Sequence, residues 1–248
     1  MARRVLILFC IVTNLLLLSP GCSVKEDRGQ CPAVLKLILP AGDGEVFVSM
    51  MGPEGDPVTH RAELLKEPSE VSYHVCHEGF TLVVSTVAWK DSLITVQAGM
   101  ESPELLVHRS YVHVDKETFT EQVDLMKEYC ALEVFVVSQS PEPTLRIRGR
   151  WCGQDIEGTL VKGQFQAPLA SGNSIRVPRQ EDTSLMLDIM DGDNVLRSFA
   201  IGEYMDEAGY DWHAESLEDI SVKVDYVHNR VQLTGSAWNQ VFPIKIEL

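Results

Sequence analysis

Short runs in which apolar and polar residues alternate recur along most of the chain, separated by glycine, proline, asparagine and aspartate. A period of two, or a short β-branched run between turn residues, is the pattern of a β-strand. No run in the first half keeps the 3.6-residue period of an amphipathic helix. The first half therefore predicts strands at Val34–Leu39, Val46–Met50, Val71–Val75, Phe80–Ala88, Leu93–Gln97, Glu104–Val114 and Gln122–Met126.

The second half repeats this pattern after a break near residues 128–131. The turn sequence Asp191–Asn194 predicts a hairpin, and Glu203–Ala208 could form one short helix. About a dozen short strands at this spacing are typical of β-sandwiches. We expect an all-β protein with one sandwich in residues 31–129 and another in residues 130–248. The strands expected in the second are Ala131–Ser138, Thr144–Trp151, Asp155–Val161, Ser184–Met190, Val195–Ile201, Ser221–Val227, Arg230–Thr234 and Pro243–Leu248.

Residues 1–21 have the pattern of a secretion signal, and we expect them to be removed on export. Arg3 and Arg4 precede the apolar run Val5–Leu18, which is shorter than the roughly 18–20 residues of a membrane-spanning helix. Cleavage between Gly21 and Cys22 would make Cys22 the first mature residue, which resembles the lipobox of bacterial lipoproteins. The pattern departs from the usual lipobox because Ser19 replaces a leucine and Pro20 follows it. The alternative is an ordinary signal peptide in which Cys22 is a stray or disulfide-bonded thiol.

A charged tether follows in residues 22–30. Lys25, Glu26 and Asp27 resemble the export signal of surface-displayed lipoproteins in Bacteroidota, although a segment this polar is also simply a solvated tether. Residues 1–21 contain two arginines and no acidic residue, so their removal changes the formal net charge from −15 to −17. A chain this acidic should not bind nucleic acid or anionic lipid headgroups through its charge. Any attachment of the protein to the outer membrane would therefore come from the N-terminal lipid.

Four cysteines remain once Cys10 leaves with the signal and Cys22 takes the lipid: Cys31, Cys76, Cys130 and Cys152. An even number in an exported protein permits two disulfides, in one of three pairings that the sequence does not select. One disulfide per half would pair Cys31 with Cys76 and Cys130 with Cys152. The alternative is free, buried thiols. None of the cysteine and histidine spacings is that of a zinc site.

The sequence offers no recognisable catalytic motif. The nucleophile elbow, the metalloprotease helix, the phosphate loop and the dinucleotide fingerprint are all missing. Arg146, Arg148 and Arg150 share one face of a predicted strand, which could grip an acidic partner but is more often a solvated face. We therefore expect neither an enzyme nor a cofactor or metal site.

The C-terminal half carries a family pattern in Val177–Ile189, Val195–Met205, Ala208–Tyr226 and the late Trp238. With Gly21–Pro32, this order resembles the FimB-type fimbrial anchor lipoproteins of Bacteroidota type V pili. The words Pro178-Arg179-Gln180 and Gly209-Tyr210-Asp211-Trp212 carry most of the likeness. The resemblance implies two tandem transthyretin-like β-sandwiches. It also implies a place at the base of a pilus, where such proteins fix the fibre to the outer membrane and limit its length.

The resemblance further implies assembly by β-strand addition, with a fimbrial stalk subunit as the partner. Stalk subunits lose an N-terminal strand, whereas an anchor should keep it, here Val34–Leu39, so that its groove stays filled. Pro243–Leu248, with Ile244, Ile246 and Leu248 on one face, is the candidate donor strand; the alternative is a plain closing strand. Two other roles remain open: a surface lipoprotein that binds glycan or host protein, and a tip or accessory fimbrial subunit.

Overall fold

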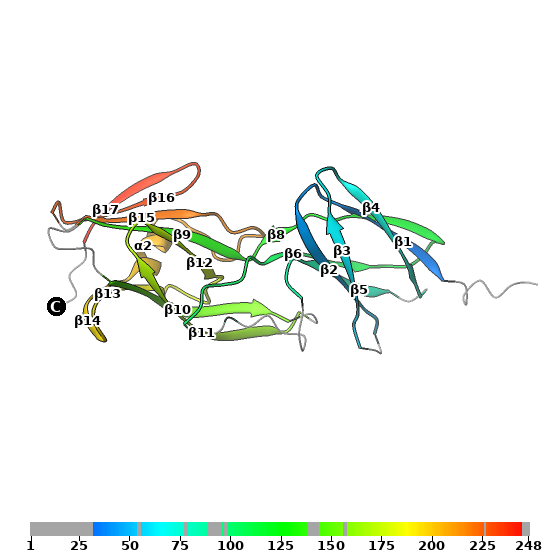
Figure 1. The fold of residues 1–248 in the computed structure, drawn as a ribbon, viewed down its shortest axis with the longest axis horizontal. Helices are drawn as coiled ribbons and strands as arrows, with labels where there is room; N and C mark the ends of the chain where they lie inside the picture. Colours follow the sequence, from blue (N-terminus) through cyan, green and yellow to red (C-terminus); the bar gives the residue numbers. More distant parts are fainter. Residues whose placement is uncertain are drawn as a thin grey trace, which may run out of the picture.

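The computed structural model describes residues 32–53, 56–76, 79–88, 96, 99–137, 144–155, 158–225 and 227–244. The predictions for the signal peptide, Cys22, the Lys25–Asp27 signal and Cys31 lie outside these residues, as do those for Ile246 and Leu248 and most of the expected strand Leu93–Gln97. The described chain forms two β-sandwiches that lie end to end along the long axis of the molecule (Figure 1). The predicted fold class, all-β with two tandem sandwiches, is confirmed.

The N-terminal domain packs a three-stranded sheet, in the order β4-β1-β7, against a five-stranded sheet, in the order β3-β2-β5-β6-β8. Leucines and valines that alternate along the central strands point between the sheets and form its core. The strands are β1 (Ala33–Leu39), β2 (Gly44–Met51), β3 (Val58–Leu64), β4 (Ser69–Val75), β5 (Phe80–Ser85), β6 (Leu106–Val112), β7 (Thr118–Gln122) and β8 (Met126–Lys127).

The C-terminal domain packs a four-stranded sheet, in the order β11-β10-β13-β14, against a five-stranded sheet, in the order β12-β9-β15-β16-β17. Its core is the larger of the two and includes aromatic side chains such as Phe165 and Tyr204. The elements are β9 (Tyr129–Val137), β10 (Thr144–Gln154), β11 (Leu160–Ala170), β12 (Asn173–Pro178), β13 (Met186–Asp191), β14 (Asn194–Phe199), α2 (Ile201–Glu207), β15 (Ile220–Asp225), β16 (Arg230–Thr234) and β17 (Asn239–Pro243).

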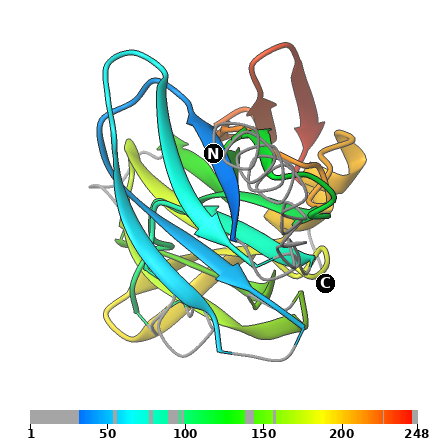
Figure 2. The same ribbon diagram turned by 90° about the vertical axis from the view of Figure 1, so that its right-hand side faces the viewer.

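The two domains repeat one strand arrangement. β1 is antiparallel to β4 and parallel to β7, and β9 is likewise antiparallel to β12 and parallel to β15. The order β3-β2-β5-β6 in the N-terminal domain corresponds to β11-β10-β13-β14 in the C-terminal domain. The C-terminal domain adds α2 and the β16–β17 hairpin, which projects from the rest of the domain in both views (Figures 1 and 2).

The sequence prediction differs from the structure at several strands. Only Leu160 and Val161 of the expected strand Asp155–Val161 belong to a longer strand, β11, and β12 was not predicted. β3 was not predicted, because most of its side chains are exposed and its edge position needs no apolar alternation. The last strand was expected at Pro243–Leu248 but β17 spans Asn239–Pro243, since its pairing with β16 begins at Thr234 opposite Asn239. The predicted short helix is α2, displaced by about one residue at its end. Among the described residues, no helix is long and apolar enough to cross a membrane.

Candidate functional site

The groove of the N-terminal sandwich is filled by β1, the first strand of the described residues. Within the described residues, β4 and β7 pair with no strand of this sheet except β1. Leu35, Leu37 and Leu39 point into the core and are fully buried, while Lys36 faces out and pairs with Glu70 at 2.8 Å. The burial of alternate residues therefore sets one face of β1 into the sandwich.

The loss of β1 would open this domain. Each fully buried leucine contributes roughly 1.5–3 kcal/mol, so the three together contribute roughly 5–9 kcal/mol. That is as large as the whole free energy of unfolding of a typical small domain. Without β1, the groove between β4 and β7 would need another strand with the same apolar alternation.

Backbone hydrogen bonds outside the ladder also fix the ends of β1. The Val34 amide donates to the Glu117 carbonyl at 2.9 Å, and the Val123 amide donates to the Ile38 carbonyl at 3.0 Å. Both partners flank β7, so the loops on either side of that strand are tied to β1. β1 is therefore an integral strand of the domain.

The end of the chain packs in the C-terminal domain as far as Ile244. Ile244 is 6% exposed and belongs to the core, and its amide donates to the Asn229 carbonyl at 3.1 Å. Phe242 of β17 is also buried and lies with its ring centroid 5.7 Å from that of Tyr204 in α2. Up to Ile244, the chain thus closes its own sandwich, as the alternative reading of this segment expected.

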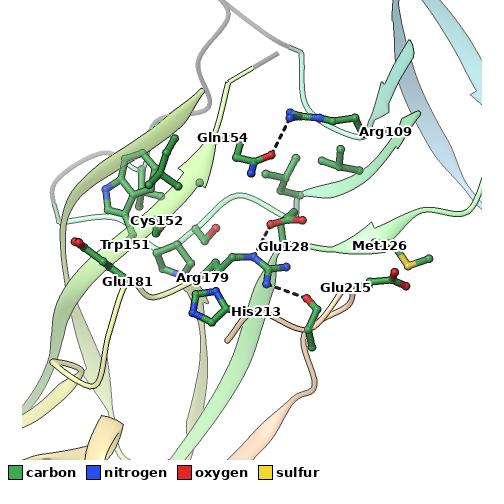
Figure 3. Close-up of a pocket in the computed structure, with 18 of the residues that line it drawn as sticks. Arg109, Met126, Glu128, Trp151, Cys152, Gln154, Arg179, Glu181, His213 and Glu215 are labelled. Atoms are coloured by element: carbon green, nitrogen blue, oxygen red, sulfur yellow. Dashed lines mark hydrogen bonds and ion pairs between the residues drawn. The ribbon is translucent and has the colours of Figure 1, made fainter. Parts of the chain in front are cut away.

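A cleft of about 720 Å³ lies where the two domains meet (Figure 3). From the N-terminal side, Arg109 of β6 donates to the side chain of Gln154 at 2.9 Å and to the Asp155 carbonyl. From the C-terminal side, Arg179 donates to the Glu128 carboxylate at 2.8 Å and to the Ala214 carbonyl at 2.8 Å. Both arginines are thus occupied by partners within the chain.

The cleft has the character of a domain junction. Lys162 on its wall pairs with Glu181, so this cation too is neutralised. The Cys152 thiol lines the cleft, and its burial raises its pKa, which disfavours the reactive thiolate. The polar groups of the cleft therefore tie the two sandwiches together. Sequence reasoning noted Arg179 only as part of a family word and missed Arg109, whose strand shows no unusual pattern.

The three arginines of β10 are bound within the domain. Arg146 and Arg148 both donate to the carboxylate of Asp188, which is completely buried on the outer face of the sheet, and Arg150 pairs with Asp182. Burial would raise the pKa of Asp188, but hydrogen bonds from Arg148, Ser198 and Arg146 outweigh it and lower the pKa below its usual value. These arginines, which the sequence suggested could grip an acidic partner, thus bind acidic residues of their own domain, and sequence reasoning did not identify Asp188.

The proposed disulfide between Cys130 and Cys152 is wrong, because both residues are free thiols, as is the exposed Cys76. Cys130 lies on β9 and points into the core, where burial raises its pKa to about 12. Cys152 lies on β10, in the opposite sheet, and lines the interdomain cleft. The Cys130 thiol therefore faces the core, whereas the Cys152 thiol faces the cleft. Among the described residues, no group of histidine, cysteine, aspartate and glutamate side chains could hold a metal ion.

No protein-family profile and no curated protein matches the sequence. Solved structures do match the fold. The fimbrial anchor protein Mfa2 from Porphyromonas gingivalis superposes with a TM-score of 0.56 at 10% identity, covering 87% of this chain and 100% of that one. A candidate adhesin from Bacteroides ovatus has a TM-score of 0.53 at 8% identity, covering 86% and 95%. A candidate adhesin from Bacteroides thetaiotaomicron has a TM-score of 0.50 at 13% identity, covering 88% and 100%. The resemblance to fimbrial anchor proteins is thus confirmed for the fold, which this chain shares over nearly its whole described length.

Proposed function

We propose that this protein is a structural subunit that anchors a fimbria to the outer membrane and ends the growth of the fibre. The observation that carries the proposal is the place of β1. A subunit whose N-terminal groove is filled by its own strand cannot accept a donor strand there. It therefore terminates a chain of subunits linked by strand addition. The fold shared with an anchor protein supports this role.

Attachment to the membrane rests on the start of the chain. After cleavage at Gly21, Cys22 would carry the lipid, and Lys25, Glu26 and Asp27 would direct the protein to the cell surface. Ten residues separate Cys22 from the first residue of β1. Even fully extended, they span no more than about 35 Å, so β1 would lie near the membrane.

The partner is a stalk subunit, and the end of this chain is the candidate donor. Phe242, Ile244, Ile246 and Leu248 alternate with other residues and would form one apolar face of an extended strand. Because Phe242 and Ile244 are buried in their own core, donation requires β17 to leave β16 and both side chains to be buried again in the stalk groove. The β16–β17 hairpin has no counterpart in the N-terminal domain, so β17 could leave without breaking the repeated arrangement.

A fibre assay tests this proposal. Deletion of the protein should give fibres that are long and shed into the medium. Ile244→Asp with Ile246→Asp should also release the fibres, while the variant protein stays in the membrane. Because Ile244 also packs in its own core, Ile246→Asp with Leu248→Asp serves as a second variant, and Lys245→Ala with Glu247→Ala is the matched control. Normal fibre length and attachment in the deletion strain would reject the anchor. Normal attachment in both Asp variants would reject only the donor.

The membrane attachment is tested separately. Cys22→Ala should release the protein from the membrane fraction or leave the precursor uncut, and unchanged retention with unchanged mature mass would contradict lipidation. Replacement of Lys25, Glu26 and Asp27 by alanine should hide the protein from protease added to intact cells. Equal accessibility would leave this segment as a tether only.

A tip or accessory subunit is the second candidate, favoured by the two adhesin-like neighbours. Such a subunit would also keep a filled N-terminal groove if no further subunit adds to it. Immunogold labelling distinguishes the two roles, because the anchor lies at the base of the fibre and a tip subunit at its far end.

A further inference from the structure

A segment of the N-terminal domain crosses to the C-terminal domain and makes a backbone hydrogen bond to an edge strand of each of its two sheets. Residues 99–105, here called the strap, precede β6. The Gly99 amide donates to the Gln166 carbonyl of β11 at 2.9 Å, and the Ser102 amide donates to the Arg176 carbonyl of β12 at 2.9 Å. The strap therefore contacts one edge strand from each of the two sheets of the C-terminal domain.

Arg176 provides most of the hold on the strap. Its backbone amide donates to the Glu101 carboxylate at 3.1 Å, and its guanidinium donates to the same carboxylate and to the Ser102 carbonyl, the latter at 2.9 Å. With the bond from Ser102, both edge-facing backbone groups of Arg176 are satisfied by the strap. Ser102 is only 3% exposed, so the backbone bond of its amide is shielded from water. The side chains of Arg176 and Glu101 are half-buried, at 35% and 38% exposure.

The strap covers the side on which the two sheets end. Within the described residues, β11 pairs only with β10 and β12 pairs only with β9, so each has one free edge. Val96, just ahead of the strap, packs against the C-terminal core, and Leu105 at its end is 9% exposed. Unpaired edges of this kind are the places at which another strand can add.

We propose that the strap covers the free edges of β11 and β12 within its own chain and so closes the C-terminal sandwich to strand addition. When the strap is released, this edge accepts the same segment from a second copy of the chain. The inference does not depend on the proposed anchor role. The strap would close the edge in the purified full-length protein whatever the function of the fold.

Charge reversal at the strap tests the proposal. Glu101→Lys places two cations together and should free the strap. The exchange of the Ser102 and Arg176 amides, followed by NMR, should speed up by about tenfold or more, because charge-assisted hydrogen bonds are lost. Glu101→Lys with Arg176→Glu restores the opposite charges and should slow the exchange again. Met100→Ala, at a side chain that is 57% exposed on the same segment, is the matched control and should change nothing.

Occupancy of the edge is then probed with a synthetic peptide of residues Val96–Leu105. The peptide should bind the Glu101→Lys protein saturably, with shifts at Gln166 and Arg176, and should not bind the wild type. A peptide that carries lysine at position 101 should not bind either protein. Unchanged amide exchange in Glu101→Lys overturns the proposal, because the ion pair then does not hold the strap. Faster exchange without peptide binding also overturns it, because the edge is then no strand acceptor.

Discussion

The two sandwiches share one strand arrangement but complete it in different ways. The N-terminal domain is completed from its own first strand, β1, which lies between β4 and β7. The C-terminal domain has β9 in that place. It also contains α2 and the β16–β17 hairpin, and it is contacted by the strap of the N-terminal domain. A repeated fold thus leaves the edges and the groove as the variable parts, and these are the parts to which the proposed strand addition would apply.

The domains also differ on the outer face of one pair of equivalent sheets, which contain β5 in the N-terminal domain and β13 in the C-terminal domain. In the N-terminal domain, the outward position of β5 opposite Ser49 is Val83, and it is fully buried. In the C-terminal domain, the outward position of β13 opposite Arg146 is Asp188, which is equally buried but charged. The same geometry is therefore filled by an apolar side chain in one domain and by an ionic cluster in the other.

The largest expected effect is the loss of stability when a charge is placed in the core of one domain. Leu37→Asp places a charge in the centre of the N-terminal core and should lower its free energy of unfolding by more than about 4 kcal/mol. Leu132→Asp should do the same to the C-terminal domain, since both leucines are fully buried. Scanning calorimetry should lose one transition in each variant and keep the other. The loss of both transitions in either variant would show that the sandwiches unfold as one unit.

The next effect distinguishes the two outer faces. Asp188→Asn leaves Arg146 and Arg148 without their anion and should destabilise the C-terminal domain by about 3 kcal/mol at neutral pH. The folded protein lowers the pKa of Asp188, so its stabilisation is present above the unfolded pKa near 3.9 and is lost as the pH falls further.

Thermal unfolding measured from about pH 6 to about pH 2, a range that includes the unfolded pKa of about 3.9, checks this effect. The wild-type C-terminal transition should lose stability below about pH 4, and the Asp188→Asn variant should lose less. Val83→Ala serves as the N-terminal comparison, because its cost should not vary with pH. An equal acid dependence in wild type and Asp188→Asn would contradict the ionic role.

A smaller effect concerns the junction. Arg179→Ala removes the bonds to Glu128 and to the Trp212 and Ala214 carbonyls and should destabilise the C-terminal domain by about 2 kcal/mol. Since Glu128 links the last strand of one domain to the first strand of the other, the two calorimetric transitions should also move apart. Arg179→Lys keeps the charge but not the fork of donors, so it should restore only part of the loss. An unchanged profile would mean that the other junction contacts suffice.

The smallest effect concerns the hairpin that only the C-terminal domain has. Glu218 accepts from Trp238 Nε1 at 3.0 Å and from the Ser236 amide and hydroxyl, and the Ser236 bond lowers its pKa. Glu218→Gln keeps an acceptor but loses the charge, and we expect a loss of about 1 kcal/mol or less. Amide exchange near Ser236 should speed up locally, whereas exchange in β1 should not change.

The sequence predicted strands that are short, mostly apolar runs, and it missed the solvated β3, most of β11 and all of β12. β1 was found because it is a short apolar run interrupted only by Lys36. β3 and β12 were not found, since solvation or a short length hides their period. The filled groove followed from β1 and the family resemblance. The strap could not be predicted, because its contacts with Gln166 and Arg176 use backbone groups and side chains far away in the sequence. The disulfide prediction failed for a related reason, since cysteine spacing does not say which side of a sheet a thiol faces.

The strand that fills the groove would also carry tension. β1 is registered with β4 over seven residue pairs and with β7 over five, and the chain enters it at Ala33. Because ladder hydrogen bonds lie across the strands, a pull along the chain from the proposed lipid anchor would strain them together in shear rather than open them one after another. A fibre dragged by flow would thus pull on a whole ladder at once. The length of β1, and not the affinity of any single contact, would then set the force at which an anchored subunit lets go.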